Sequence, residues 1–124
     1  MATVNSLAAR LDGPDEPRYR LAPHNIDAEQ ALLGAILVNN EAFFRVSDFL
    51  EPAHFHEEVH RRIYEVASSL IKAGKIATPI TLKTFLGDHD LGGLTVSQYL
   101  ARLAAEATTI INAEDYGRTI HDLA

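Results

Sequence analysis

The chain has 124 residues, 47% of them hydrophobic, which fits one globular domain and excludes a wholly disordered chain. It contains no cysteine, no apolar run of the roughly 20 residues that cross a bilayer and no recognisable export signal, so we expect a cytoplasmic protein without disulfides or cysteine-ligated zinc. The formal net charge is −6 and the longest basic cluster is Arg61-Arg62, so direct binding of nucleic acid by this segment is not expected.

Residues 1–22 contain Gly13, Pro14 and Pro17 and show no sustained apolar period, so they are interpreted as a flexible N-terminal tail. Of the 11 basic and 17 acidic residues of the chain, three of each lie in this tail. The remaining eight basic and fourteen acidic residues give residues 23–124 the whole net charge. This part has helical periodicity throughout and no convincing strand pattern. It is predicted to be an all-α domain, a compact bundle of five or six short helices in orthogonal packing.

A stripe of leucine and isoleucine residues predicts the first helix over about 27–38, with Asn25 or Asp27 as its cap. Gly34 lies in the middle of this helix, where glycine costs about 1 kcal/mol relative to alanine. Such a glycine usually marks a close approach of another helix. We therefore expect a second helix to pack against Gly34.

A short second helix follows, with Phe43, Val46 and Leu50 facing inward. The third helix is predicted to begin immediately after Pro52 and to end at Gly74, which can adopt the left-handed conformation of a C-terminal cap. Its predicted apolar stripe consists of Val59, Ile63, Val66 and Leu70.

The last three helices are predicted from capping signals. Thr78-Pro79 begins a short fourth helix that ends near Gly87, and a polar, glycine-rich loop occupies residues 88–94. Thr95 and Gln98 have capping-box spacing at the start of the fifth helix. Asn112 is predicted to cap the last helix. The inward residues of the last two helices are predicted to be Val96, Tyr99, Leu100, Leu103, Ala107, Ala113, Tyr116, Ile120 and Leu123.

The stretch HFHEEVH at residues 54–60 contains H-E-x-x-H, the spacing of many zinc proteases. If His56 and His60 lie on one helix they share a face, and Glu57 would then be the general base beside a metal-bound water. A catalytic zinc needs a third protein ligand. The candidates His89 and His121 lie in a loop and near the C-terminus, without a motif around them.

A structural interpretation of the same stretch is favoured. Glu57 and Glu58 near a helix N-terminus complement the helix dipole. We expect His60 to pack or hydrogen-bond beside the core, with His54 and His56 exposed. No catalytic, cofactor-binding or metal-binding residue is assigned, and an H-E-x-x-H zinc hydrolase is kept as a remote alternative.

Four stretches of the chain keep a distinctive order and spacing. They are PHNIDAEQALLGAIL at 23–37, HFHEEVHRRIYEVASSLIKAGK at 54–75, LGGLTVSQYLARLA at 91–104 and INAEDYGRTI at 111–120. Together they resemble the amino-terminal domain of bacterial replicative DNA helicases of the DnaB type, over about residues 22–124. The matching positions taken as structural family-motif residues are Glu29, Leu33, Gly34, Phe55, His60, Arg61, Ile63, Tyr99, Leu100, Asn112 and Tyr116.

The resemblance implies a non-catalytic domain of a primosome protein active in DNA replication. Members of the family are hexameric rings driven by ATP and Mg, which are expected for the full-length parent and not for this segment. The ATPase motor domain, which follows a helical linker in the family, is absent from this chain, because no Walker A motif is present. The last helix is expected to lead towards that linker.

The expected partners are other copies of the chain, as dimers and as a hexamer of the full-length protein, and primase, with the helicase loader as a further candidate. DNA is expected to bind only through the full-length ring, and no membrane is involved. The alternative is a general helical adaptor for protein–protein interaction.

Two positions depart from the family pattern. Gly117 stands where alanine is usual, which should loosen the last helix by roughly 1 kcal/mol. Thr78 stands where aspartate is frequent, so it is expected to be a weaker cap. The position of His56 is not a fixed histidine in the family, which makes the H-E-x-x-H match accidental in this interpretation.

Overall fold

The computed structural model describes residues 25–107 and 112–124. These residues form α1 (Ile26–Val38), α2 (Glu41–Phe44), the short 3-10 helix η1 (Pro52–His54), α3 (Glu58–Lys72), α4 (Pro79–Leu86), α5 (Val96–Ala105) and α6 (Ala113–Leu123). Within the described ranges the only strand-like pairing is an isolated bridge between Asp90 and Thr95. The prediction of an all-α bundle is confirmed, while the predicted tail lies outside the described residues.

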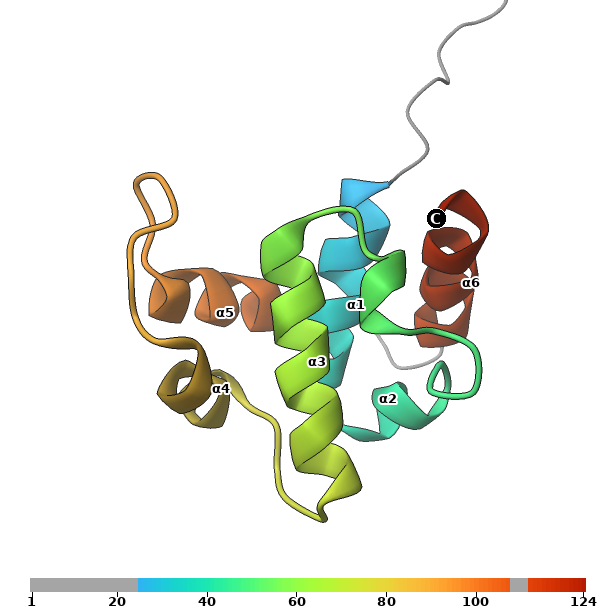
Figure 1. Cartoon of the computed structure of the whole chain (residues 1–124), viewed down its shortest axis with the longest axis horizontal. Helices are drawn as coiled ribbons and strands as arrows, with labels where there is room; N and C mark the ends of the chain where they lie inside the picture. The colour runs from blue at the N-terminus through green and yellow to red at the C-terminus, as the bar shows by residue number, and fades with distance from the viewer. Residues whose placement is uncertain (1–24, 108–111) are drawn as a thin grey trace, which may run out of the picture.

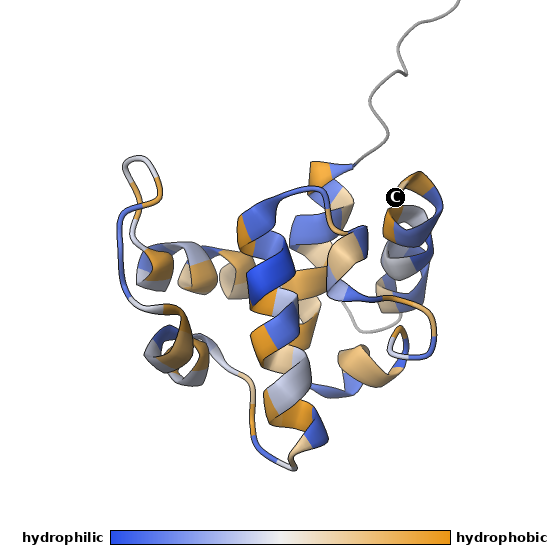
Figure 2. Cartoon of the chain, in the orientation of Figure 1, coloured by the Kyte–Doolittle hydropathy of each residue, from blue (hydrophilic) through white to orange (hydrophobic). Residues whose placement is uncertain are grey.

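Helix α1 lies at the centre of the domain. It contacts α3, α5, α6 and α2, and α4 packs on α3 and α5 (Figure 1). Six consecutive residues of α1, from Leu32 to Leu37, are buried, so every side of this stretch faces protein. A helix that is apolar on all sides is expected inside a bundle, and Figure 2 shows this apolar helix behind the more polar outer surface of α3.

Asn25 is the cap of α1, because its side chain accepts a hydrogen bond from the backbone N–H of Ala28.

The predicted close approach at Gly34 is confirmed. A Cβ atom on Gly34 would overlap the backbone carbonyl of Leu103 on α5. The absence of a side chain lets the two helix backbones meet there.

Helix α3 begins later than predicted. Pro52 starts the 3-10 turn η1, and α3 begins only at Glu58, so the predicted start immediately after Pro52 is wrong. The predicted apolar stripe is also displaced, because Val59 and Val66 are only partly buried. The buried face of α3 consists of His60, Ile63, Tyr64, Ala67, Ser68, Leu70 and Ile71.

Most of the predicted caps are confirmed. The Thr78 hydroxyl accepts a hydrogen bond from the backbone N–H of Thr81, and Gly87 ends α4 with a φ of 79°. Thr95 and Gln98 form the reciprocal capping box at the start of α5. Asn112 is the exception, since its side chain makes no capping hydrogen bond to α6.

Gly117 has a packing role that helix propensity does not reveal. A Cβ atom at this position would overlap the side chain of Val46 and would lie 3.3 Å from the ring of Phe49. The glycine therefore allows α6 to approach the segment that follows α2. The expected cost of Gly117 to the stability of the helix stays a prediction. The close contact with Val46 and Phe49 explains why a residue without a side chain fits at this position.

No helix in the described part of the chain is both long and apolar enough to cross a membrane.

Candidate functional site

The carboxylate of Glu29 is buried inside the domain, with only 1% of the residue exposed. Its Oε1 atom lies 2.7 Å from Nδ1 of His60, and its Oε2 atom accepts a 2.7 Å hydrogen bond from the backbone N–H of His56. The backbone N–H of Glu57 reaches Oε1 at 3.4 Å. Glu29 therefore binds the amide groups that precede α3, although it belongs to α1.

His60 continues this network to α5. Its Nε2 atom lies 2.5 Å from the hydroxyl of Tyr99, and the side-chain amide of Gln30 donates to that hydroxyl at 3.2 Å. Burial raises the pKa of Tyr99, so the phenol keeps its proton at neutral pH and can donate to Nε2. The tautomer of the His60 ring with its hydrogen on Nδ1 donates to Glu29 and accepts from Tyr99, so it satisfies the whole chain from Gln30 to Glu29.

Arg61 holds the same turn from its carbonyl side. Its guanidinium donates to the backbone oxygens of Phe55 at 3.0 Å and His56 at 3.2 Å. The ring of Phe55 is buried and packs 5.0 Å from the ring of Tyr64, centroid to centroid. In the segment between η1 and α3, Glu29 thus binds backbone N–H groups and Arg61 binds backbone carbonyl oxygens.

The network has the form of a structural connection between three helices. Glu29 and His60 are each 1% exposed, and their polar atoms are used by α1, α3 and α5 themselves. A general base must reach a substrate proton within hydrogen-bonding distance. Both ring nitrogens of His60 are occupied by groups of the protein, so the network connects the three helices of the bundle.

The geometry of a zinc protease is not formed by the H-E-x-x-H sequence. His56 and Glu57 precede the first residue of α3, so the two histidines do not share a helical face. Among the described residues, no three His, Cys, Asp or Glu side chains converge in a way that could hold a metal ion.

His54 differs from its expected exposure. It is half-buried, and its ring lies 4.9 Å from the ring of His121 on α6, centroid to centroid. His121 also packs 5.8 Å from the ring of Phe49. These contacts attach α6 to η1 and to the segment after α2. His56 is exposed, as expected.

The other family-motif residues fall into two groups. Leu33, Phe55, Ile63 and Leu100 are buried core residues, and Gly34 forms the close contact with α5. Asn112 and Tyr116 lie on or beside α6, outside the Glu29–His60–Tyr99 network. The sequence interpretation named Glu29, His60 and Tyr99 separately as family-motif residues and did not predict that they meet. It also did not single out Gln30 or the backbone amide of His56, which complete the network.

The fold and the network together define an all-α domain in which buried polar residues connect three helices. The family model described as "DnaB-like helicase N terminal domain" matches residues 21–122. This chain belongs to that family.

Relatives of similar sequence agree with this family assignment. The chain is 45% identical to a replicative DNA helicase DnaB of Rickettsia felis over 111 residues, which are 89% of this chain and 22% of the relative. It is 34% identical to the replicative DNA helicase DnaC of Bacillus subtilis, covering 83% of this chain and 23% of the relative. The chain therefore spans less than a quarter of the length of these relatives.

A solved structure has the same fold. The N-terminal domain of DnaB helicase from Mycobacterium tuberculosis superposes with a TM-score of 0.73 at 26% sequence identity. The match covers 82% of this chain and 72% of that structure.

Proposed function

We propose that this chain is the non-catalytic N-terminal domain of a replicative DNA helicase, and that it contributes to ring assembly and to the binding of primase and the helicase loader. The observation that carries the proposal is the extent of the family match, which includes residues 21–122 and thus nearly the whole chain. The relatives named as replicative helicases contain this region as less than a quarter of their length.

The side-chain chemistry of the domain supports a scaffold role. The buried carboxylate and imidazole of Glu29 and His60 are used in connecting helices, so the chemistry of the parent protein belongs to another part of it. Hydrolysis of ATP, with Mg, is proposed for that part and not for this segment. We propose that the domain belongs to the collar of the helicase ring, the layer formed by its amino-terminal domains. The negative net charge fits a collar that does not hold DNA tightly, because tight binding would hinder movement along the strand.

Self-association is the first test. We expect dimers of the 124-residue chain in sedimentation equilibrium at raised concentration, with α5 and α6 at the contact. Ala101 is exposed on α5, so Ala101→Arg should weaken the dimer by introducing a charged side chain there. Ala73→Arg, at an exposed position after α3, is the matched control and should leave the dimer unchanged. A monomeric mass for the unmodified chain at millimolar concentration contradicts this part of the proposal.

Partner binding distinguishes the helicase domain from a general helical adaptor. In isothermal titration calorimetry, primase from the same organism should bind the chain saturably. The gene beyond residue 124 should encode a G-x-x-x-x-G-K-[ST] motif. Absence of both results would favour the adaptor.

A further inference from the structure

The exposed large hydrophobic side chains come from two segments of the chain. Among the described residues they are Val38, Phe44, Ile76, Ile80 and Phe85, and each is between 55% and 77% exposed. The first two lie at the end of α1 and on α2, and the other three lie before and on α4. Exposed apolar side chains that are grouped in this way mark a contact surface.

The two segments meet at Asn40 and Ala77. The side-chain amide of Asn40 donates to the backbone oxygen of Ala77 at 2.8 Å, and the amide oxygen accepts from the backbone N–H of Ala77 at 2.9 Å. Val38 precedes Asn40 by two residues, and Ile76 directly precedes Ala77. Exposed apolar residues therefore border this junction from both segments, between α2 and α4, which lie on opposite sides of the C-terminal end of α3 (Figure 1).

Ile80 continues the apolar surface along α4. The Thr81 hydroxyl donates to the backbone oxygen of Ile76 at 2.9 Å, which holds Ile76 at the first turn of this helix. Ile80 and Lys83 are both exposed and three residues apart, so they are neighbours on the outer side of α4. We call five exposed residues the α2–α4 surface, namely Val38, Glu41, Ile76, Ile80 and Lys83.

Charges of opposite sign lie at the two ends of the α2–α4 surface. Glu41 is exposed in the first turn of α2, directly after Asn40, and Lys83 is exposed on α4. Neither residue belongs to an ion pair in the described part of the chain. Arg45 and Lys75 are also exposed near the two ends, so the complementary charges are the single residues Glu41 and Lys83.

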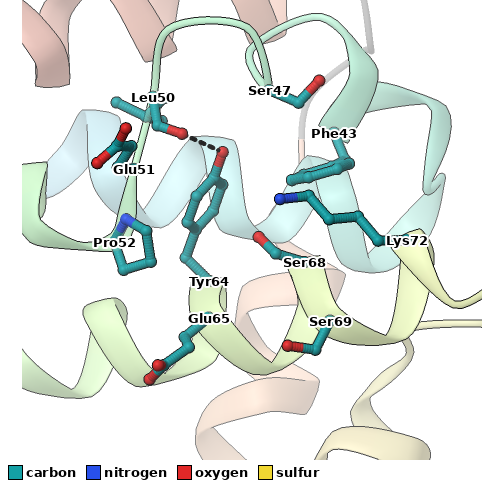
Figure 3. A pocket seen from close by; sticks show the side chains of 10 residues that line it. All are labelled: Phe43, Ser47, Leu50, Glu51, Pro52, Tyr64, Glu65, Ser68, Ser69 and Lys72. Carbon is teal, nitrogen blue, oxygen red and sulfur yellow. Dashed lines mark hydrogen bonds between the residues drawn. The ribbon is translucent and has the colours of Figure 1, made fainter.

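Two further charged groups near these helices have other positions. The pKa of Asp88 is lowered chiefly by hydrogen bonds from Ser97 and also by Lys83, and its carboxylate accepts from the backbone N–H of Ser97 at the start of α5. Lys72 extends into a separate groove between α3 and the segment that joins α2 to η1, where carboxylates line the far end (Figure 3). Lys83 therefore remains available to a carboxylate of another molecule.

A surface with opposite charges on either side of an apolar centre is complementary to itself. A twofold axis near Ile76 places α2 of one copy over α4 of a second copy, so that Glu41 of each copy faces Lys83 of the other. Val38, Ile76 and Ile80 of both copies then form the apolar centre of the contact. Unlike charges meet in this arrangement, which favours the pairing and fixes its orientation.

We propose that the α2–α4 surface binds the same surface of a second copy of this chain. An isologous contact stops at two copies, because each copy has then used its surface. A dimer held through α5 and α6 therefore needs a further contact to grow into a ring. The role in ring assembly rests on the proposed function, whereas the contact itself follows from the exposed residues.

Sedimentation equilibrium of four forms of the 124-residue chain separates the two contacts. The forms are the unmodified chain, Ile80→Asp, Ala101→Arg and the double variant, at concentrations up to about 1 mM because small contacts are weak. Ile80 is 77% exposed in the first turn of α4, where an acidic residue favours the helix, so Ile80→Asp should fold normally. We expect species larger than a dimer for the unmodified chain, at most dimers for each single variant and monomers for the double variant.

Ser69→Asp is the control, because it adds the same charge at an exposed position of α3 outside the α2–α4 surface. It should associate as the unmodified chain does. Association that Ile80→Asp does not weaken overturns the α2–α4 contact, and association that Ala101→Arg does not weaken overturns the α5–α6 contact of the proposed function. An unmodified chain that stays monomeric overturns both.

Charge reversal tests whether the occupant of the surface is a second copy. In the Ala101→Arg chain, adding Glu41→Lys leaves lysine at both ends of the surface, and adding Lys83→Glu leaves glutamate at both ends. Each of these chains alone should dimerise at least about fivefold more weakly than the Ala101→Arg chain, because like charges then meet. An equimolar mixture of the two should restore the dimer, since every lysine meets a glutamate of the other chain.

The matched control uses Glu65→Lys and Lys72→Glu, which reverse two exposed charges of α3 outside the α2–α4 surface. In the Ala101→Arg chain these changes should leave dimerisation unchanged, separately and in a mixture. Circular dichroism of every variant checks that the helical content and the melting temperature are kept. A mixture of the Glu41→Lys and Lys83→Glu chains that dimerises no better than its separate components overturns the twofold pairing.

Discussion

At Glu29 both carboxylate oxygens accept hydrogen bonds from donors on another helix or turn, one from the His60 ring and one from the backbone of His56. An ionised carboxylate offers acceptors only, whereas an amide offers one oxygen and one NH₂ group. Burial of this carboxyl group is tolerated because each of its oxygens is hydrogen-bonded. A side chain with two acceptor oxygens therefore fits this position, where donors meet both oxygens.

This arrangement predicts that replacing the Glu29 carboxylate by an amide destabilises the domain. Glu29→Gln has the same shape, but one of its two terminal groups is an NH₂ donor. If the NH₂ group faces the His56 amide N–H, that donor loses its acceptor; if it faces His60, the ring must carry its hydrogen on Nε2 and can no longer accept from Tyr99. Either arrangement breaks one hydrogen bond of the network, so we expect a loss of about 1–3 kcal/mol in the free energy of unfolding. The measurement is the urea midpoint at constant slope.

Glu41→Gln is the control for this substitution. Glu41 is an exposed residue in the first turn of α2, so the same chemical change should alter stability by less than about 0.5 kcal/mol. Equal midpoints for Glu29→Gln and the unmodified chain would show that the buried carboxylate does not stabilise the turn before α3.

At the scale of helices, two glycines determine how closely neighbouring elements approach. Gly34→Ala brings a Cβ atom against a backbone carbonyl of α5, which cannot move without displacing the helix. We expect destabilisation of about 1–3 kcal/mol from overpacking, although alanine is intrinsically the better helix former by about 1 kcal/mol. Thermal unfolding of the variant measures the sum of the two effects.

Gly117→Ala provides the comparison within the same domain. The added methyl group meets the Val46 side chain, which can be shortened. Combining Gly117→Ala with Val46→Ala should therefore cost less than the sum of the two single changes, whereas a strictly additive result would exclude their contact.

The sequence predicted the parts of each helix that depend on neighbouring residues. Thr78, Thr95 and Gly87 act within three or four positions of themselves, so their spacing was sufficient to place helix ends. The start and the buried face of α3 could not be predicted in this way. The turn before α3 is bound by Glu29, which lies 31 positions before His60 in the chain, and the buried face of α3 is the one that α1, α4 and η1 contact.

The family-motif residues show the same limit. Leu33, Ile63 and Leu100 were recognisable as core residues from their helical periodicity. The polar residues Glu29, His60 and Tyr99 belong to three different helices, so no local pattern predicts that they meet. Periodicity identifies which side of a helix is apolar, but it does not identify which distant polar group completes a buried hydrogen bond.

For the whole molecule, net charge and the positions of its cations determine how the domain meets nucleic acid. The chain has 11 basic and 17 acidic residues, and some of the basic groups are already engaged within the protein. The guanidinium of Arg61 binds backbone oxygens of the turn before α3. That of Arg118 lies 3.8 Å from the centre of the Phe49 ring and pairs with Glu114. With acidic residues in excess and these two guanidinium groups engaged within the protein, a continuous basic face is not expected.

We therefore predict that the 124-residue chain does not bind single-stranded DNA at physiological salt. Proteins that bind DNA non-specifically reach dissociation constants of about 10⁻⁴ to 10⁻⁶ M by neutralising several phosphates, and that requires clustered lysine or arginine. Fluorescence anisotropy of a labelled thymidine oligonucleotide should show no saturation up to about 100 μM protein at roughly 0.15 M salt. The same titration at low salt is the control, since weak electrostatic association should appear only there. Saturable binding at physiological salt would contradict this prediction and would show that the cations of the domain form a DNA-binding face.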